Sequence, residues 1–289
     1  MIELGANRYG KGGIHIVRVD RTTDPHRVRD VYVSVQLEGD FEAAHVEGDN
    51  ALVVPTDTMK NTTFALARDH LAGAIETYAT VLSGHFLQFE QVAHATATVR
   101  EVAWRPLQTS SGASDHGMVR DTSMTRTTVV RSDRDGARVR SGVEDVALMK
   151  TTKSGFSGFP RDRFTTLPEV DDRMMVSSVS ASWAYGPQGA GGASEPDWDA
   201  LHGQVWSTLV DVFHEHYSPS LQSSIWLMGK AILERVPAVE DVTMAWPNLH
   251  HWIVDLAPFG MTNDGTIYHA TTEPHGMIEA TVRRTEVGG

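Results

Sequence analysis

Apolar and polar residues alternate in three stretches near the start of the chain, which is the pattern of half-buried β-strands. "IHIVRVDR" (14–21) and "VYVSVQLEG" (31–39) predict a pair of antiparallel strands. "QVAHATATVREVAW" (91–104) predicts a third strand. In that strand the alternation assigns Ala93, Ala95, Ala97 and Val99 to one face and Val92, His94, Thr96 and Thr98 to the other.

Between the second and third strands the apolar period lengthens to three or four residues, which predicts a helix over 60–83. Gly73 is a point at which this helix could divide, because glycine is a poor helix former. The apolar positions that define the helix are Phe64, Ala67, Leu71, Ile75, Tyr78 and Leu82.

A polar segment with glycine and serine, "QTSSGASDHG" (108–117), precedes a second block of similar plan and is interpreted as a linker. In the second block, "TRTTVVRS" and "GARVRSGVEDVALMK" predict two strands joined by a hairpin at Asp135-Gly136. A long strand, "RMMVSSVSASWAY", comes next, followed by a glycine-rich loop (187–194) to which the sequence assigns no role. Two helices follow, separated by "SPS" as stop and N-cap. "VEDVTMAW" and "HWIVDL" predict the last strands.

The order strands, helices, strands therefore occurs twice. This order predicts the α+β class, with two units at 1–108 and 118–289, each an antiparallel sheet with helices on one face.

Composition narrows the range of partners. The formal net charge of −12 argues against a general nucleic-acid-binding protein, which needs clustered basic residues to neutralise phosphates. The chain contains no cysteine, which excludes disulfides and thiolate metal ligands and fits a reducing compartment. No apolar run approaches the length of a membrane helix, and "MIELGANRYGKGG" is unlike a signal peptide. We expect a soluble, cytoplasmic protein with neither nucleic-acid nor membrane partners.

Several polar residues have both a structural and a functional interpretation. Thr56-Asp57-Thr58 follows an apolar run and precedes a helix, which predicts an N-cap with polar residues in the first turn. The same helix end presents free amides to an anion, so the cluster could be both cap and binding site. Lys11, between glycines, could be a solvated turn residue. His250 precedes a strand, where a histidine is usually structural, and Arg173 could form a surface ion pair.

Five segments together remove much of this ambiguity. "NRYGKGGI", "VVPTDTMKNT", "SGFSGFPRDRFTTLPEVDDR", "YSPSLQSSI" and "WPNLHHW" resemble, in order and spacing, motifs of the urate oxidase (uricase) family, and the resemblance to bacterial members covers nearly the whole chain. It implies tandem tunnelling-fold units that close into a barrel in a homotetramer, with active sites at subunit interfaces. The implied reaction is oxidation of urate by O2 and water to 5-hydroxyisourate and H2O2, with no metal and no organic cofactor.

The resemblance also implies roles for individual residues. Lys11, Thr56 and His250 match the catalytic proton relay of the family.

A second set matches the residues that hold the substrate. Arg173 and Gln222 match the pair that binds the polar edges of the purine, Phe156 the aromatic ring that stacks on it, and Asn248 the asparagine beside the oxygen or water site. Further substrate-lining positions are matched by Asp57, Leu167 and Leu221, and at Leu221 a valine is common in the family.

Two alternatives stay open on the sequence. One is another enzyme of the same fold, such as a pterin-handling cyclohydrolase or aldolase, although the missing cysteines disfavour the zinc-dependent cyclohydrolase. The other is a catalytically inactive purine-binding protein of the same fold. The joint presence of Lys11, Thr56 and His250 argues against it, because a binder would not need a proton relay.

Overall fold

The computed structural model describes residues 2–186 and 196–285. The glycine-rich loop 187–194 lies outside these residues. The chain forms two compact units, of which the first comprises Met1–Glu144 and Ala184–His202 and the second comprises Asp145–Trp183 and Gly203–Gly289. The boundaries fall inside two strands and one helix.

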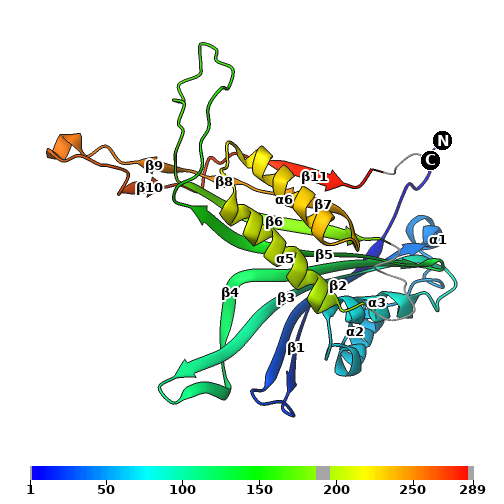
Figure 1. Ribbon diagram of the computed structural model, residues 1–289. Helices are drawn as coiled ribbons and strands as arrows, with labels where there is room; N and C mark the ends of the chain where they lie inside the picture. Colours follow the sequence, from blue (N-terminus) through cyan, green and yellow to red (C-terminus); the bar gives the residue numbers. More distant parts are fainter. Residues whose placement is uncertain (1, 187–195, 286–289) are drawn as a thin grey trace. The chain divides into compact units, whose positions relative to one another are not determined.

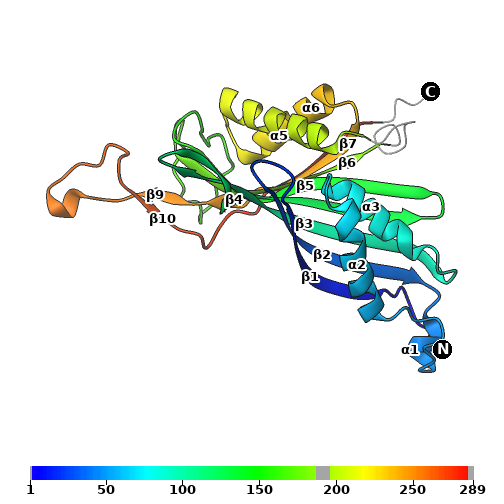
Figure 2. The same cartoon turned by 90° about the horizontal axis from the view of Figure 1, so that it is seen from below.

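The first unit is an antiparallel sheet with helices packed on one face (Figures 1 and 2). Among its described residues, five successive strands form four antiparallel pairs, each between strands that are neighbours in the chain. Val31, Val33, Val35 and Leu37 are fully buried on the face that alternation predicted. The elements are β1 (Tyr9–Asp20), β2 (Arg27–Gly39), α1 (Glu42–Val46), α2 (Thr56–His70), α3 (Ile75–Phe86), β3 (Val92–Thr109), β4 (Gly112–Asp133) and β5 (Gly136–Lys150).

The predicted helix over 60–83 is two helices, since α2 ends at His70 and α3 begins at Ile75, on either side of Gly73. α2 packs on β1, and α3 packs on β3 and β4. The predicted hairpin is confirmed, because Asp133 pairs with Gly136, whose φ of 147° suits glycine.

One face assignment was wrong at the start of β3. Val92 is buried and Ala93 is exposed, the reverse of the predicted arrangement. The cause is a register shift in the β2–β3 pairing, in which Glu38 lies opposite His94 but Gly39 lies opposite Val92. The extra residue in β3 is a β-bulge, which inverts the alternation.

The segment interpreted as a linker, 108–117, has regular structure. It forms the tip of a long hairpin, in which Gln108 pairs with Ala113 and Thr109 with Gly112. The compact units therefore have different bounds from the predicted 1–108 and 118–289. The long β3–β4 pairing explains the difference, because it groups β4 with the first unit.

In the described part of the second unit, the α-helices are α6 and the greater part of α5, and they accompany antiparallel strand pairs. α6 packs on β7 and β11, and β8 pairs with β6. β9 and β10 form a separate two-stranded sheet. The sequence patterns do not predict β8, β10 or β11. None of the helices within 2–186 and 196–285 is both long and apolar enough to cross a membrane. The elements are β6 (Met175–Tyr185), α5 (Trp198–Glu215), α6 (Leu221–Arg235), β7 (Val239–Ala245), β8 (Asn248–Leu249), β9 (His251–Ile253), η1 (Ala257–Phe259), β10 (Tyr268–Ala270) and β11 (Glu279–Arg283).

Candidate active site

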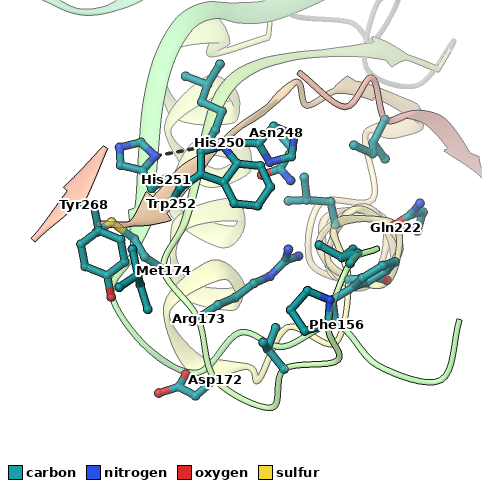
Figure 3. A pocket seen from close by; sticks show the side chains of 18 residues that line it. Phe156, Asp172, Arg173, Met174, Gln222, Asn248, His250, His251, Trp252 and Tyr268 are labelled. Atoms are coloured by element: carbon teal, nitrogen blue, oxygen red, sulfur yellow. Dashed lines mark hydrogen bonds between the residues drawn. The ribbon is translucent and has the colours of Figure 1, made fainter. Parts of the chain in front are cut away.

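A cavity of about 450 Å³ lies in the second unit (Figure 3). Three parts of the chain form its walls: the irregular segment before β6, the start of α6, and the region from β8 to β11. The lining residues are Phe156, Leu167, Pro168, Val170, Asp172, Arg173, Met174, Ser220, Leu221, Gln222, Asn248, Leu249, His250, His251, Trp252, Ile253, Tyr268 and Ile278.

Phe156 and Arg173 form one wall through backbone hydrogen bonds. The amide of Phe156 donates to the carbonyl of Val170 at 2.7 Å, and the amide of Arg173 donates to the carbonyl of Ser154 at 2.7 Å. These bonds bring two segments seventeen residues apart in the chain side by side. The guanidinium carbon of Arg173 lies 5.4 Å from the centre of the Phe156 ring.

The Arg173 side chain is free to bind a ligand. Its Nε is buried and has no hydrogen-bond partner among the residues that the structure describes. Burial lowers the pKa of Arg173, because the charged form loses hydration. The group nevertheless remains a cation at neutral pH. A polar, anionic edge of a ligand would satisfy this unpaired donor.

The start of α6 supplies Leu221 and Gln222. Ser220 is the N-cap, and its side chain accepts a hydrogen bond from the amide of Ser223 at 3.2 Å, as "SPS" predicted. Leu221 is buried, whereas Gln222 is exposed at the first turn and lines the cavity. An amide there offers both a donor and an acceptor.

Asn248 and His250 come from the opposite wall. The amide of Asn248 donates to the carbonyl of Gly276 at 2.8 Å, and β8 pairs with β6. The His250 ring is stacked on Trp252, with centroids 5.1 Å apart. Partial burial lowers the pKa of His250, and the charges of Arg173 and His275 lower it further. The imidazole is therefore neutral at neutral pH and can accept a proton.

The other predicted residues, Lys11, Thr56 and Asp57, lie in the first unit. The Tyr9 hydroxyl donates to the Val54 carbonyl at 3.1 Å and accepts from the Val54 amide at 2.7 Å. This double contact joins the strand that carries Lys11 to the segment that leads into Thr56. Lys11 is close enough to Asp57 for its charge to affect that carboxylate.

The interpretation of 56–58 as an N-cap is wrong. The N-cap position of α2 is Pro55, and no side chain caps the helix there. Thr56 and Asp57 occupy the first turn instead, because proline fixes an extended entry into the helix. Hydrogen bonds from Lys60, and less strongly from Asn61, lower the pKa of Asp57. The amides of the first turn have no partner within the helix, which suits an anionic ligand.

The structure thus brings seven of the predicted residues to one cavity: Phe156, Leu167, Arg173, Leu221, Gln222, Asn248 and His250. Sequence reasoning missed several residues that share the cavity. Asp172 and Trp252 lie within the motifs "PEVDDR" and "WPNLHHW", so these motifs could have predicted them as cavity residues. Met174 and Tyr268 carried no such signal.

An α+β protein with a half-buried guanidinium beside an aromatic ring, and with amide side chains facing them, is suited to bind a small planar ligand with polar edges. Comparison with known proteins specifies the class. The uricase family model matches residues 7–131 and 139–279. The chain belongs to the uricase family.

Individual relatives agree along the whole length. Uricase from Arthrobacter globiformis is 39% identical over 284 residues, which cover 98% of this chain and 90% of the relative. Uricase from Dictyostelium discoideum is 35% identical over 289 residues, covering 99% of both chains.

Solved structures give the same result. The crystal structure of uricase from Arthrobacter globiformis matches with a TM-score of 0.92 at 38% identity, covering 100% of this chain and 97% of the other. The structure of a uricase from Bacillus fastidious matches with a TM-score of 0.82 at 25% identity, covering 96% and 93%. The predicted α+β class is confirmed by the antiparallel sheet and helices that this chain shares with these tunnelling-fold proteins.

Proposed function

We propose that the protein is a urate oxidase, an oxidoreductase that uses O2 as electron acceptor. Urate, O2 and water give 5-hydroxyisourate and H2O2. Two electrons pass from the purine to O2, which takes up two protons, and water supplies the oxygen of the new hydroxyl group. Membership of the uricase family and the chemistry of the cavity support this function.

The observation that carries the proposal is the position of the Arg173 guanidinium beside the Phe156 ring, with Gln222 and Asn248 lining the same cavity. Urate is a planar anion with hydrogen-bonding groups along its edge. The ring of Phe156 would stack on the purine and fix its plane. Arg173 would donate a planar pair of hydrogen bonds to one edge, and the Gln222 amide would match a donor and an acceptor on another.

The remaining predicted positions complete the binding site. Leu167 and Leu221 would contact the purine with apolar surface. Asp57, together with Thr56, would offer backbone amides from the first turn of α2 to the anion. Asn248 would hold the O2 or water that reacts with the purine.

Electron-rich deprotonated urate can transfer electrons to O2 directly, so the residues of the protein have a protonic and electrostatic task. Lys11 would take protons from the purine through the Thr56 hydroxyl, and His250 would complete the relay. A neutral His250 can accept a proton, and Lys11, when protonated, would stabilise negative charge on the purine. No metal or organic cofactor takes part in this proposal.

The predicted residues divide between the two units, with Lys11 and Thr56 in the first and the Arg173 cavity in the second. We further propose a homotetramer, in which the Lys11 group of one subunit meets the Arg173 group of its neighbour. Closure of the sheets into a barrel would also cover exposed strand edges. We propose a cytoplasmic location, which agrees with the absence of cysteine.

The test is urate consumption in air-saturated buffer that contains a strong chelator and no added cofactor. The near-ultraviolet absorbance of urate, O2 uptake and H2O2 release are followed together. We expect loss of urate with equal amounts of O2 consumed and H2O2 formed. No turnover, with binding of the inert analogue 8-azaxanthine intact, would instead identify a catalytically inactive purine-binding protein.

A further inference from the structure

Tyr217 and Ser218, in the turn between α5 and α6, are not among the residues that line the cavity, yet they contact two of the segments that are. The amide of Ser218 donates to the carbonyl of Lys153 at 2.9 Å, and the carbonyl of Ser218 accepts from the amide of Gly155 at 2.8 Å. Phe156 follows Gly155 directly. The backbone of Ser218 therefore holds the segment that presents the stacking ring.

The side chain of Ser218 is fully buried and belongs to a chain of polar groups. Its Oγ lies 2.7 Å from the Oγ of Ser224, which lies 2.8 Å from Nε2 of His216. Nδ1 of His216 is 2.5 Å from the carbonyl of Val212, and so donates to it. Nε2 is then the acceptor in the neutral ring, which orders the chain as Ser218 to Ser224 to His216.

This series of hydrogen bonds requires the His216 ring to be neutral. Burial lowers the pKa of His216, and the charge of Lys150 lowers it further. Lys150 donates to the backbone carbonyl of His216 at 2.6 Å. Because Ser224 is the fourth residue of α6 and its amide donates to the carbonyl of the N-cap Ser220 at 3.2 Å, the same series of hydrogen bonds fixes the start of the helix that carries Gln222.

Tyr217 makes the second contact. Its hydroxyl donates to the carbonyl of Asp171 at 2.7 Å, two residues before Arg173. The same hydroxyl packs so close to Gly155 that a Cβ there would lie 2.1 Å from it. Tyr217 thus contacts both the segment before Phe156 and the segment before Arg173.

We propose that Tyr217 and Ser218 are positioning residues that hold Phe156 and Arg173 at the separation a planar ligand requires. This inference rests on the proposed function, since the ligand is taken to be a purine. Neither side chain lines the cavity, so each acts through residues that do. A small error in the distance between the ring and the guanidinium would weaken stacking or the paired hydrogen bonds.

The test uses Tyr217→Phe, which removes one hydroxyl from a side chain that is 50% exposed, and Ser218→Ala. We expect KM for urate and Kd for 8-azaxanthine to rise about three- to tenfold, the effect of losing one hydrogen bond, while kcat changes less than about twofold.

The matched control is Ser83→Ala. Ser83 is also fully buried, and its Oγ lies 2.7 Å from that of Ser132, so the control deletes an equivalent serine pair in the first unit. It should lower stability without a change in KM. An equal rise in KM from Ser83→Ala would overturn the inference, as would wild-type constants for both Tyr217→Phe and Ser218→Ala.

A double-mutant cycle tests the route of the effect. In an Arg173→Ala background, Tyr217→Phe should have a smaller effect on the Kd of 8-azaxanthine than in the wild type. Full additivity would show that Tyr217 does not act through Arg173. A wild-type protein that binds 8-azaxanthine without oxidising urate would overturn the proposed function alone, and one that binds no purine would overturn both.

Discussion

Gly10 passes so close to Val35 on the neighbouring strand that a Cβ at Gly10 would lie 1.9 Å from the Val35 carbonyl oxygen. The neighbouring atom is backbone, so it cannot move aside by a change of rotamer. Lys11 comes next in the chain. Gly10, the first glycine of "YGKGG", is therefore required by the close approach of the two strands. Its position also determines where the Lys11 side chain begins.

Gly10→Ala should destabilise the protein by about 1–3 kcal/mol through overpacking. Displacement of Lys11 should also lower urate turnover by about 10- to 100-fold. Gly12→Ala is the control, because a Cβ there would lie 3.4 Å from the Ser34 hydroxyl, a tolerable contact. Thermal unfolding and kcat measured on both variants test the prediction, and equal behaviour of the two would contradict it.

Arg173→Ala should weaken binding of 8-azaxanthine by at least about tenfold, since each charge-assisted hydrogen bond contributes about 1.5–3 kcal/mol. Arg173→Lys should recover only part of this loss, because it keeps the charge without the planar pair of donors. Isothermal titration measures both constants. As a control, Arg163→Lys alters another arginine that lies on an aromatic ring, that of Phe164, outside the cavity lining. Binding unchanged in Arg173→Ala would refute the assignment.

Lys11→Ala should abolish most turnover and leave the Kd of 8-azaxanthine within a few-fold of the wild type. The reason is that the amine moves protons, while the purine is held by Arg173 and Phe156. Stopped-flow absorbance gives turnover, and titration gives the Kd. Lys230→Ala, which removes an exposed lysine paired with Glu234, is the control and should be fully active. Persistent turnover in Lys11→Ala at neutral pH would exclude the relay.

The shared site can be tested by mixing two inactive variants. If one subunit supplies Lys11 and its neighbour supplies Arg173, then Lys11→Ala and Arg173→Ala chains together form some sites with both residues intact. Partial activity should return after subunit exchange, which a mass difference between tagged chains can verify. Proven exchange without recovery would argue against a site formed by two subunits.

His202 gives the protein a defined sensitivity to acid. Burial lowers its pKa to about 4, and the charge of Arg126 contributes. The unfolded chain therefore takes up this proton at higher pH than the folded chain. The free energy of unfolding should fall as the pH drops from about 6.5 towards 4, by about 3 kcal/mol from this residue.

Denaturant unfolding at pH 7 and pH 4 tests this at one protein concentration. His202→Asn should lose less stability over this range than the wild type does. His214→Asn, at an exposed position of the same helix, should behave as the wild type. Identical pH dependence in all three proteins would show that His202 is not responsible.

Periodicity predicted the elements well where one face is buried and the other solvated. Val31 to Leu37 is the clearest case, because two-residue alternation leaves a single way to bury the strand. It failed at Ala93, where a bulge depends on the pairing with β2 and leaves no local signal. It also failed at 108–117, since polar residues with glycine and serine suit a hairpin tip as well as a linker.

The residues of the candidate site also differ in how far the sequence could predict them. Local chemistry left Arg173 as a surface ion pair, and only the resemblance of "PEVDDR" to a family motif gave it a role. Its proximity to Phe156 depends on the bridge to Val170, a contact between separated segments that no local pattern contains. Tyr268 is the extreme case, because it reaches the cavity through the pairing of β9 and β10.

The first unit is interrupted in the chain, and this has a consequence for synthesis. Arg126 lies 2.9 Å from the fully buried Glu76 and 2.5 Å from Asp199, which is one of the residues that return to the first unit. A nascent chain that has emerged through β5 contains Glu76 and Arg126 but lacks the second carboxylate. The ribosome must therefore synthesise the chain past Asp199 before this charge network can close, and neither unit corresponds to one uninterrupted segment of the chain.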